Sequence, residues 1–228
     1  MAPVKVVIFG ATGGLGQRVW RSAVDAGHQV VAFVRSPHKL DDADPHFAAL
    51  EVVQGDVMDR EAVQAAASGA EVVVNCTSPA GGNATIDLAK AVVTAAAAAG
   101  VERFYMVGGI GALWAPGTQK TVLLQDWDDP EAAKQYGLPP SIPRDMIRKM
   151  TRGHLASMEF LATTNLAHAF MCPGAMFDGP ESPGRTVTLD ELGGQGAMRV
   201  SYADIARVIV DDLNVGALLG HRVCVAPA

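Results

Sequence analysis

A glycine-rich turn near the amino terminus constrains this chain more than any other feature. Residues 4–9 form an apolar run of mostly β-branched and aromatic side chains, and Gly10, Gly13 and Gly16 follow it at three-residue spacing. From Leu15 onward, apolar residues recur at helical spacing. An almost uninterrupted apolar strand is typical of a parallel sheet that is covered on both faces. The segment therefore predicts a buried parallel strand, a tight turn and a helix.

The same turn indicates a ligand. Residues without a Cβ atom let the backbone turn sharply and let a ligand approach the main chain closely. An anion in front of the turn would meet free N–H groups at the positive end of the following helix. The alternative is that the glycines serve only the geometry of the turn. We predict that the turn binds the diphosphate of a dinucleotide through Gly10, Thr12, Gly13, Gly14, Leu15 and Gly16.

Apolar runs alternate with helical segments along the rest of the chain. Six such runs predict strands over residues 4–9, 30–34, 50–54, 72–74, 104–107 and 167–172, and a final short strand is expected over residues 222–225. Four helix-to-strand joints carry residue types that accept a positive φ, namely Gly27, Gly69, Gly100 and Asn165. This alternation predicts an α/β fold, a Rossmann-type doubly wound parallel sheet. We expect a single domain over residues 1–228, with a small C-terminal extension on the substrate side.

Composition narrows the class of protein. The chain has 228 residues, of which 49% are hydrophobic and 18% charged, enough for one sizeable core. A net charge of −6 argues against nucleic-acid and membrane partners, since both favour a basic surface. We find neither a signal-peptide pattern nor a membrane-spanning run, so we expect a cytoplasmic protein with a small-molecule substrate. The three cysteines and six histidines lack ligand spacing, so we predict no metal site and buried, reduced thiols. Oligomeric state is not readable from the sequence.

The residue after the second predicted strand bears on the choice of cofactor. It is Arg35, at the place where an acidic residue usually binds the ribose 2′-hydroxyl of NAD. A guanidinium there would bind a 2′-phosphate through charge-assisted hydrogen bonds, so we predict NADP(H). The alternative is a solvated basic turn. After the third strand, Asp56 and Val57 are predicted to contact the adenine; alternatively, Asp56 shapes the turn and Asp59 caps the next helix.

Further cleft residues are predicted where the later strands end. A polar segment follows the fourth strand, a long irregular segment over residues 108–141 follows the fifth, and a Gly/Pro-rich segment up to residue 196 follows the sixth. Such a long segment is typical of a lid or binding loop. The cofactor contacts predicted in these segments are Cys76, Thr77, Gly108, Pro173, Gly174 and Ala175. A helix expected over residues 144–163 carries an apolar stripe of Met146, Ile147, Met150, His154, Met158 and Leu161.

Taken together, these motifs resemble the atypical short-chain dehydrogenase/reductases. Within that family the chain is similar to the NmrA-like NAD(P)H-binding group, and there to the biliverdin reductase B (flavin reductase) type. The resemblance covers essentially the whole chain and rests on residues 10–16, 34–35, 55–57, 172–174 and 201–204. It implies a Rossmann-type fold and an NAD(P)H-dependent oxidoreductase.

The chain departs from the tyrosine-dependent members of this family. Those members carry a serine after the fifth strand and a Y-x-x-x-K motif in the fifth helix, whose tyrosine donates a proton. The corresponding places here are Gly109, Met150 and His154. The comparison therefore implies an enzyme without the Ser-Tyr-Lys triad and makes His154 the candidate catalytic residue. The alternative is that His154 is a packed residue on an apolar helix face.

Three hypotheses about function follow. The first is an NADPH-dependent oxidoreductase that delivers hydride to a planar conjugated substrate such as a flavin, a quinone or an enone. A delocalised acceptor needs little acid catalysis, and the cofactor supplies the redox chemistry. The second is a non-redox isomerase or cyclase that uses His154, and the third is an NADP(H)-binding redox sensor without catalysis. The missing triad motivates both alternatives.

Overall fold

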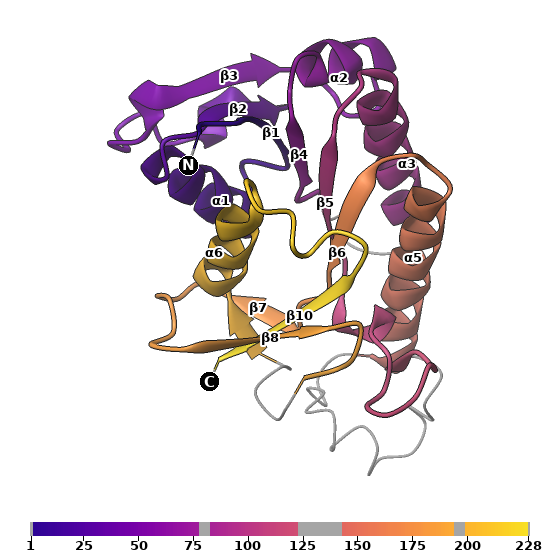
Figure 1. The fold of residues 1–228 in the computed structure, drawn as a ribbon. Coiled ribbons are helices and arrows are strands. Elements are labelled where there is room, and N and C mark those ends of the chain that lie inside the picture. Colours follow the sequence, from indigo (N-terminus) through magenta and orange to yellow (C-terminus); the bar gives the residue numbers. More distant parts are fainter. Residues whose placement is uncertain (1, 78–82, 123–142, 194–198, 228) are drawn as a thin grey trace.

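The structure, a computed structural model, describes residues 2–77, 83–122, 143–193 and 199–227. Within these residues the strands form a large sheet and a small one (Figure 1). The large sheet contains β1 (Lys5–Phe9), β2 (Gln29–Val34), β3 (Leu50–Gln54), β4 (Val72–Asn75), β5 (Arg103–Val107), β6 (Ala167–Met171), β8 (Arg185–Leu189) and β10 (Arg222–Pro227). The small sheet pairs β7 (Ala175–Phe177) with β9 (Arg199–Ser201).

The strand order confirms the predicted doubly wound sheet. It runs β3-β2-β1-β4-β5-β6-β10-β8, so the chain first moves outward from β1 to β3 and then returns to the other side of β1. Every pairing in this sheet is parallel except that of β8 with β10, which is antiparallel. The connections that follow β1 and β4 therefore leave in opposite directions at the centre of the sheet, where ligands of doubly wound folds bind.

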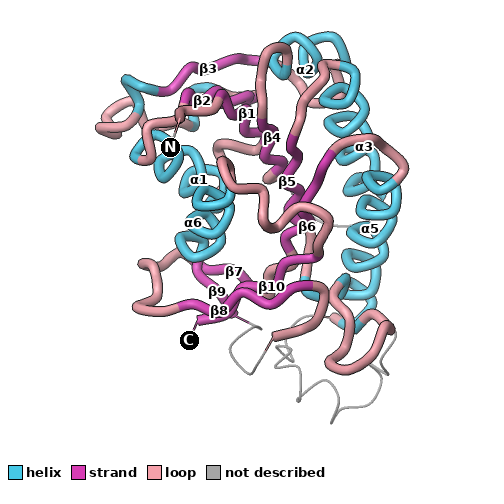
Figure 2. The backbone as a smooth tube through the Cα atoms, in the orientation of Figure 1, coloured by secondary structure: helices cyan, strands magenta, loops and turns pink. Residues whose placement is uncertain are grey.

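Helices cover both faces of the sheet. Figure 2 shows the strands as a middle layer between two groups of helices. The two groups are α1 (Gly14–Asp25) with α6 (Tyr202–Asp212) on one face, and α2 (Arg60–Ala67), α3 (Asn83–Ala98) and α5 (Arg144–Ala162) on the other. Short 3-10 turns, η1 (Pro37–Lys39), η2 (Phe47–Ala49) and η3 (Ile110–Ala112), occur in the connections.

Alternation along β1 explains its almost continuous apolar sequence. Val7 and Phe9 belong to the core that contains residues of α2, α3 and α5, whereas Val6 and Ile8 belong to the core beneath α1 and α6. All four side chains are fully buried. A strand with helices on both faces has no side that faces water, so side chains on both of its faces are apolar. This is why the amino-terminal apolar run predicts a buried parallel strand.

Three of the four predicted helix-to-strand joints are confirmed. Positive φ angles of 81°, 70° and 75° occur at Gly27, Gly69 and Gly100. The expectation for Asn165 is wrong, because Asp190 is the residue other than glycine with a positive φ among the described residues. Helix α5 ends instead at Thr163 in the right-handed helical region. Hydroxyl groups satisfy its last carbonyl groups there, since Thr163 and Thr164 donate to the oxygens of Phe160 and Leu161 at 2.7 Å each.

The carboxyl-terminal part contains more regular structure than the sequence predicts. Strands β7 and β8 lie in the Gly/Pro-rich segment that is expected only as a cleft wall, and β10 runs two residues past residue 225 to Pro227. Most of the expected lid, residues 123–141, lies outside the described residues. The described part of that segment, residues 108–122, contains η3 and contacts the strand region through a bridge between Trp114 and Glu191.

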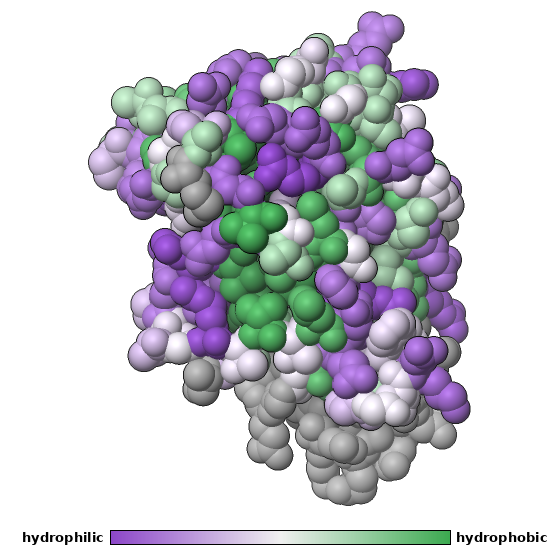
Figure 3. All heavy atoms as spheres, viewed as in Figure 1, coloured by the Kyte–Doolittle hydropathy of each residue, from purple (hydrophilic) through white to green (hydrophobic). Residues whose placement is uncertain are grey.

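One face of the molecule has an apolar surface patch. Figure 3 shows apolar side chains in the middle of one face, and Figure 1 places the connection between α6 and β10 there. Val215, in that connection, is 62% exposed. None of the described helices is both long and apolar enough to cross a membrane.

Candidate functional site

A cavity of about 570 Å³ lies at the carboxyl edge of the sheet, beside the ends of β1 and β4. It extends from the glycine turn, along the ends of β4, β5 and β6, to α5 and the start of α6. The predicted residues that line it are Gly10, Thr12, Gly13, Gly14, Leu15, Gly16, Cys76, Thr77, Gly108, His154, Pro173, Gly174 and Ala175. Residues far apart in the sequence thus meet in one cavity.

Packing requires two of the glycines in the turn. Gly10 has a φ of +78°, and a Cβ atom on it would lie 2.7 Å from the backbone of Cys76. A Cβ atom on Gly16 would overlap the carbonyl oxygen of Gly10. These two glycines bring α1 close to β1 and β4, as the strand-turn-helix pattern predicts.

Gly13 has a different environment. Its φ is −76°, which any residue adopts, and a Cβ atom on it would meet only the carbonyl oxygen of Gly10, at 3.3 Å. Backbone strain therefore does not require glycine here, and the one close packing contact is tight, but no described atom would lie as close to this Cβ as at Gly10 and Gly16. Helix α1 begins at the next residue without a side-chain cap and without an acidic residue in its first turn. The first N–H groups of a helix have no partner within the helix, so this end fits the diphosphate of a dinucleotide.

Glycines after β5 let the backbone approach α5 closely. A Cβ atom on Gly109 would lie 2.7 Å from Nδ1 of His154, and one on Gly111 would lie 2.7 Å from the hydroxyl oxygen of Thr151. Both partners belong to α5. The backbone after β5 therefore forms one wall of the cavity and α5 forms the next, with Ile110, Ile147 and Met150 also lining it.

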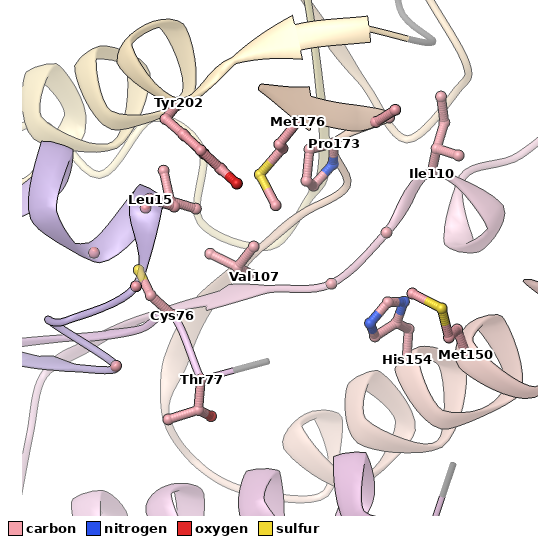
Figure 4. Close-up of a pocket in the computed structure, with 18 of the residues that line it drawn as sticks. Leu15, Cys76, Thr77, Val107, Ile110, Met150, His154, Pro173, Met176 and Tyr202 are labelled. Atoms are coloured by element: carbon pink, nitrogen blue, oxygen red, sulfur yellow. The ribbon is translucent and has the colours of Figure 1, made fainter. Parts of the chain in front are cut away.

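His154 reaches the cavity from α5. Figure 4 shows its ring beside Met150, on the opposite side of the cavity from Tyr202. Burial lowers the pKa of His154 to about 4, and no described residue hydrogen-bonds to either ring nitrogen. The imidazole is therefore neutral at pH 7. A neutral imidazole there can donate or accept a hydrogen bond, but it is not a cationic acid.

The remaining polar groups of the cavity are uncharged. The Thr77 hydroxyl donates to Oδ1 of Asn75 at 2.7 Å, and the Thr151 hydroxyl donates to the carbonyl oxygen of Ile147 at 2.9 Å. Burial raises the pKa of the Cys76 thiol to about 12, so this thiol stays protonated. Asp, Glu, Lys and Arg do not occur among the described residues that line the cavity. A ligand there is met by backbone N–H groups, neutral side chains and apolar surface.

Sequence reasoning missed several lining residues. Ile147 and Met150 could have been predicted as lining residues, because both belong to the apolar stripe expected on residues 144–163. Met146, expected on the same stripe, is 45% exposed, so the stripe is narrower than predicted. Met176 lies in the segment expected as a cleft wall after the sixth strand, whereas the place of Tyr202 in the cavity depends on how distant segments pack.

Three predicted contacts lie outside this cavity. Arg35 is exposed at the end of β2, and Asp56 and Val57 follow β3 at the adjacent strand end. The local alternative for the acidic residues is confirmed, because Asp56 accepts a hydrogen bond from the backbone of Met58 at 2.9 Å, and Asp59 caps α2. Whether Arg35, Asp56 and Val57 contact a nucleotide remains a prediction.

A family model described as NAD(P)H-binding matches residues 10–214, which is most of the chain. The match includes the glycine turn, α5 and α6, and it therefore covers the cavity from one end to the other. It agrees with the fit of the uncapped end of α1 to a dinucleotide.

Individual proteins also resemble the chain over nearly its full length. An uncharacterized protein of Bacillus subtilis, YwnB, is 25% identical over 92% of each chain. A solved Bacteroides thetaiotaomicron structure whose name proposes an epimerase has a TM-score of 0.80 and 24% identity, over 99% of this chain and 98% of that one. A Streptococcus pneumoniae structure whose name proposes an NADH-flavin reductase has a TM-score of 0.76 and 21% identity, over 99% of this chain and 100% of that one. These structures share the Rossmann-type fold.

Proposed function

The chain belongs to the NAD(P)H-binding family, and from this premise we propose that it is an NADPH-dependent reductase of a planar conjugated substrate such as a flavin, a quinone or an enone. Within the family we place it among the NmrA-like atypical short-chain dehydrogenase/reductases. The name of the Streptococcus pneumoniae structure is consistent with this substrate class.

One observation carries the proposal: the glycine turn and an uncharged, largely apolar region lie in the same cavity. That region is lined by Val107, Ile110, Ile147, Met150 and Met176. A flat apolar ring system would bury its surface against these side chains, whereas a charged substrate would find no oppositely charged side chain among the described lining residues.

The residues have the following roles in this proposal. The glycine turn and the first N–H groups of α1 would hold the diphosphate, and Gly108 and residues 173–175 would contact the nicotinamide end. Bound NADPH supplies the hydride. His154, neutral at pH 7, offers one hydrogen bond to the substrate, and the proton that completes the reduction comes from water. A delocalised acceptor stabilises the incoming charge itself, so no charged acid is needed.

Arg35 supports the preference for NADPH over NADH. It is exposed at the carboxyl end of β2, and its guanidinium has no partner among the described residues. Replacing it with aspartate (Arg35→Asp) should weaken NADPH binding about ten- to a hundredfold and leave NADH binding unchanged, because one charge-assisted contact is lost and a repulsion is added.

We also propose a cytoplasmic location, where free thiols such as those of the three unpaired cysteines persist.

The test is to mix the purified protein with NADPH and either FMN or menadione, and to follow loss of the reduced-nicotinamide absorbance. We expect oxidation only when an acceptor is present, with one acceptor reduced per NADPH, and slower oxidation of NADH. Tight NADPH binding without oxidation by either acceptor would instead support a redox sensor. Turnover without any nicotinamide would support an isomerase or cyclase.

A further inference from the structure

Tyr202 lines the cavity next to the glycine turn, and the proposed function gives this residue no role. It is the first residue of α6, and its ring packs on Gly14, the first residue of α1. A Cβ atom on Gly14 would lie 2.5 Å from Cε2 and 2.8 Å from Cζ of that ring. Figure 4 shows the side chain above Leu15 with its hydroxyl group directed into the cavity.

A buried polar cluster fixes the backbone that carries Tyr202. The preceding residue, Ser201, caps α6 by accepting a hydrogen bond from the backbone of Asp204 at 3.0 Å. Asp204 is fully buried and accepts from the backbone and the hydroxyl of Ser182 at 2.9 and 2.7 Å. Arg185 also contacts this carboxylate, at 3.4 Å. The position of Tyr202 is therefore set before any ligand binds.

The Tyr202 hydroxyl has no partner among the described residues, unlike the buried hydroxyl of Tyr105. Tyr105 donates to a carboxylate oxygen of Asp212 at 2.8 Å. No residue in the described part of the chain hydrogen-bonds to the Tyr202 hydroxyl. A tyrosine hydroxyl that faces an apolar cavity usually finds a partner, so this donor is available to a ligand.

We infer that Tyr202 is a cofactor-binding residue, whose hydroxyl donates a hydrogen bond to a phosphoryl oxygen of the dinucleotide diphosphate. The inference rests on the proposed cofactor site. The ring of Tyr202 packs on the first residue of α1, where the diphosphate would meet the free N–H groups. The described lining contains no lysine or arginine, so neutral donors must meet the phosphate charge. A hydrogen bond to a charged oxygen is stronger than one between neutral groups.

The test compares the wild type with Tyr202→Phe, which keeps the ring on Gly14 and removes only the hydroxyl. Calorimetric titration should give about tenfold weaker NADP⁺ binding for the variant. Phosphorus NMR of bound NADP⁺ should show that the diphosphate signals move in the variant while the 2′-phosphate signal stays. Tyr202→Leu also lacks the hydroxyl and should show the same loss of NADP⁺ affinity. This variant replaces Tyr202→Phe in the test if the phenylalanine variant folds poorly.

Tyr105→Phe is the matched control. It removes a phenol hydroxyl outside the cavity, so it should lower the melting temperature and leave NADP⁺ affinity unchanged. Equal NADP⁺ affinity of wild type and Tyr202→Phe, with unmoved diphosphate signals, would overturn the inference and leave the cofactor site intact. Failure of the wild type to bind either NADP⁺ or NAD⁺ would overturn the cofactor site and the inference together.

Discussion

Gly109 and His154 are, at the scale of single residues, two of the places where this chain departs from the tyrosine-dependent enzymes that its sequence resembles. Those enzymes carry a serine at the place of Gly109. Here a Cβ atom at that place would lie 2.7 Å from Nδ1 of His154, so the histidine occupies the space that a serine would need. The departures at Gly109 and His154 are therefore one packing arrangement, in which the imidazole lies against a backbone position without a side chain.

Burial of His154 predicts a specific dependence of stability on pH. The pKa of this histidine falls from 6.5 to about 4 on folding, so the unfolded chain binds the extra proton between these values. Stability contributed by the neutral imidazole is therefore complete above about pH 6.5 and is lost as the pH falls toward 4. Over that window the loss should be on the order of 2–3 kcal/mol.

The variant His154→Phe tests this, because it keeps an aromatic ring and cannot titrate. Chemical unfolding at several pH values should show that the wild type loses more stability than the variant between pH 6.5 and 4. At pH 7 the variant should turn over FMN or menadione within about threefold of the wild type, a barrier change under about 0.7 kcal/mol. A much larger loss of rate, with folding and NADPH binding intact, would show that the imidazole is required for proton transfer.

At the scale of elements, the amino terminus of α6 depends on one buried carboxylate. Burial alone would raise the pKa of Asp204, but the hydrogen bonds from Ser182 and Ser201 and the charge of Arg185 outweigh it and lower the pKa below 3.8. This stabilisation is present above about pH 3.8 and is lost as the pH falls through the lower folded value. The same carboxylate holds α6 and the segment before β8 together.

Asp204→Asn should therefore cost on the order of 2–4 kcal/mol in the free energy of unfolding at pH 7. Urea unfolding of the wild type and the variant measures this loss of stability. Asp211→Asn is the matched control on the same helix. Asp211 is exposed, and among the contacts described for it the side chain pairs only with Arg207, at 2.9 Å. The loss in free energy of unfolding for this control should stay within about 0.5 kcal/mol. Equal costs for the two variants would mean that the buried cluster does not hold α6 in place.

At the scale of the whole molecule, the sheet was predictable because its central strands are covered on both faces. Continuous apolar runs mark β1, β2, β4 and β5, and left-handed glycines mark three of the joints that lead into them. The glycine turn then places the cavity, since a doubly wound sheet has its switch point beside β1. These features are local in sequence, and local patterns suffice to find them.

The remaining features depend on contacts between distant segments. Strand β7 has three residues, and β8 alternates polar and apolar residues beside glycines and prolines, so neither shows the continuous apolar run that marks the central strands. Tyr202 is the first residue of α6, and only the packing of α6 against α1 brings its ring onto Gly14. Asn165 shows the converse: the residue type suits a positive φ, yet two threonine hydroxyls complete the helix end instead.

The central claim, that the turn exists to hold a dinucleotide, is tested most directly by the thermal unfolding of Gly13→Val with and without NADPH. A Cβ atom at Gly13 would make one tight contact in the protein alone, 3.3 Å from the Gly10 carbonyl oxygen, which a shift of that oxygen would relieve. The variant should therefore fold, but its branched side chain would occupy the place of the diphosphate. Saturating NADPH should stabilise the wild type by about 2.7 kcal/mol at a hundredfold excess over its dissociation constant, and should not stabilise the variant at any concentration. A full ligand-induced shift in Gly13→Val would contradict the claim and leave the glycine turn a purely structural feature.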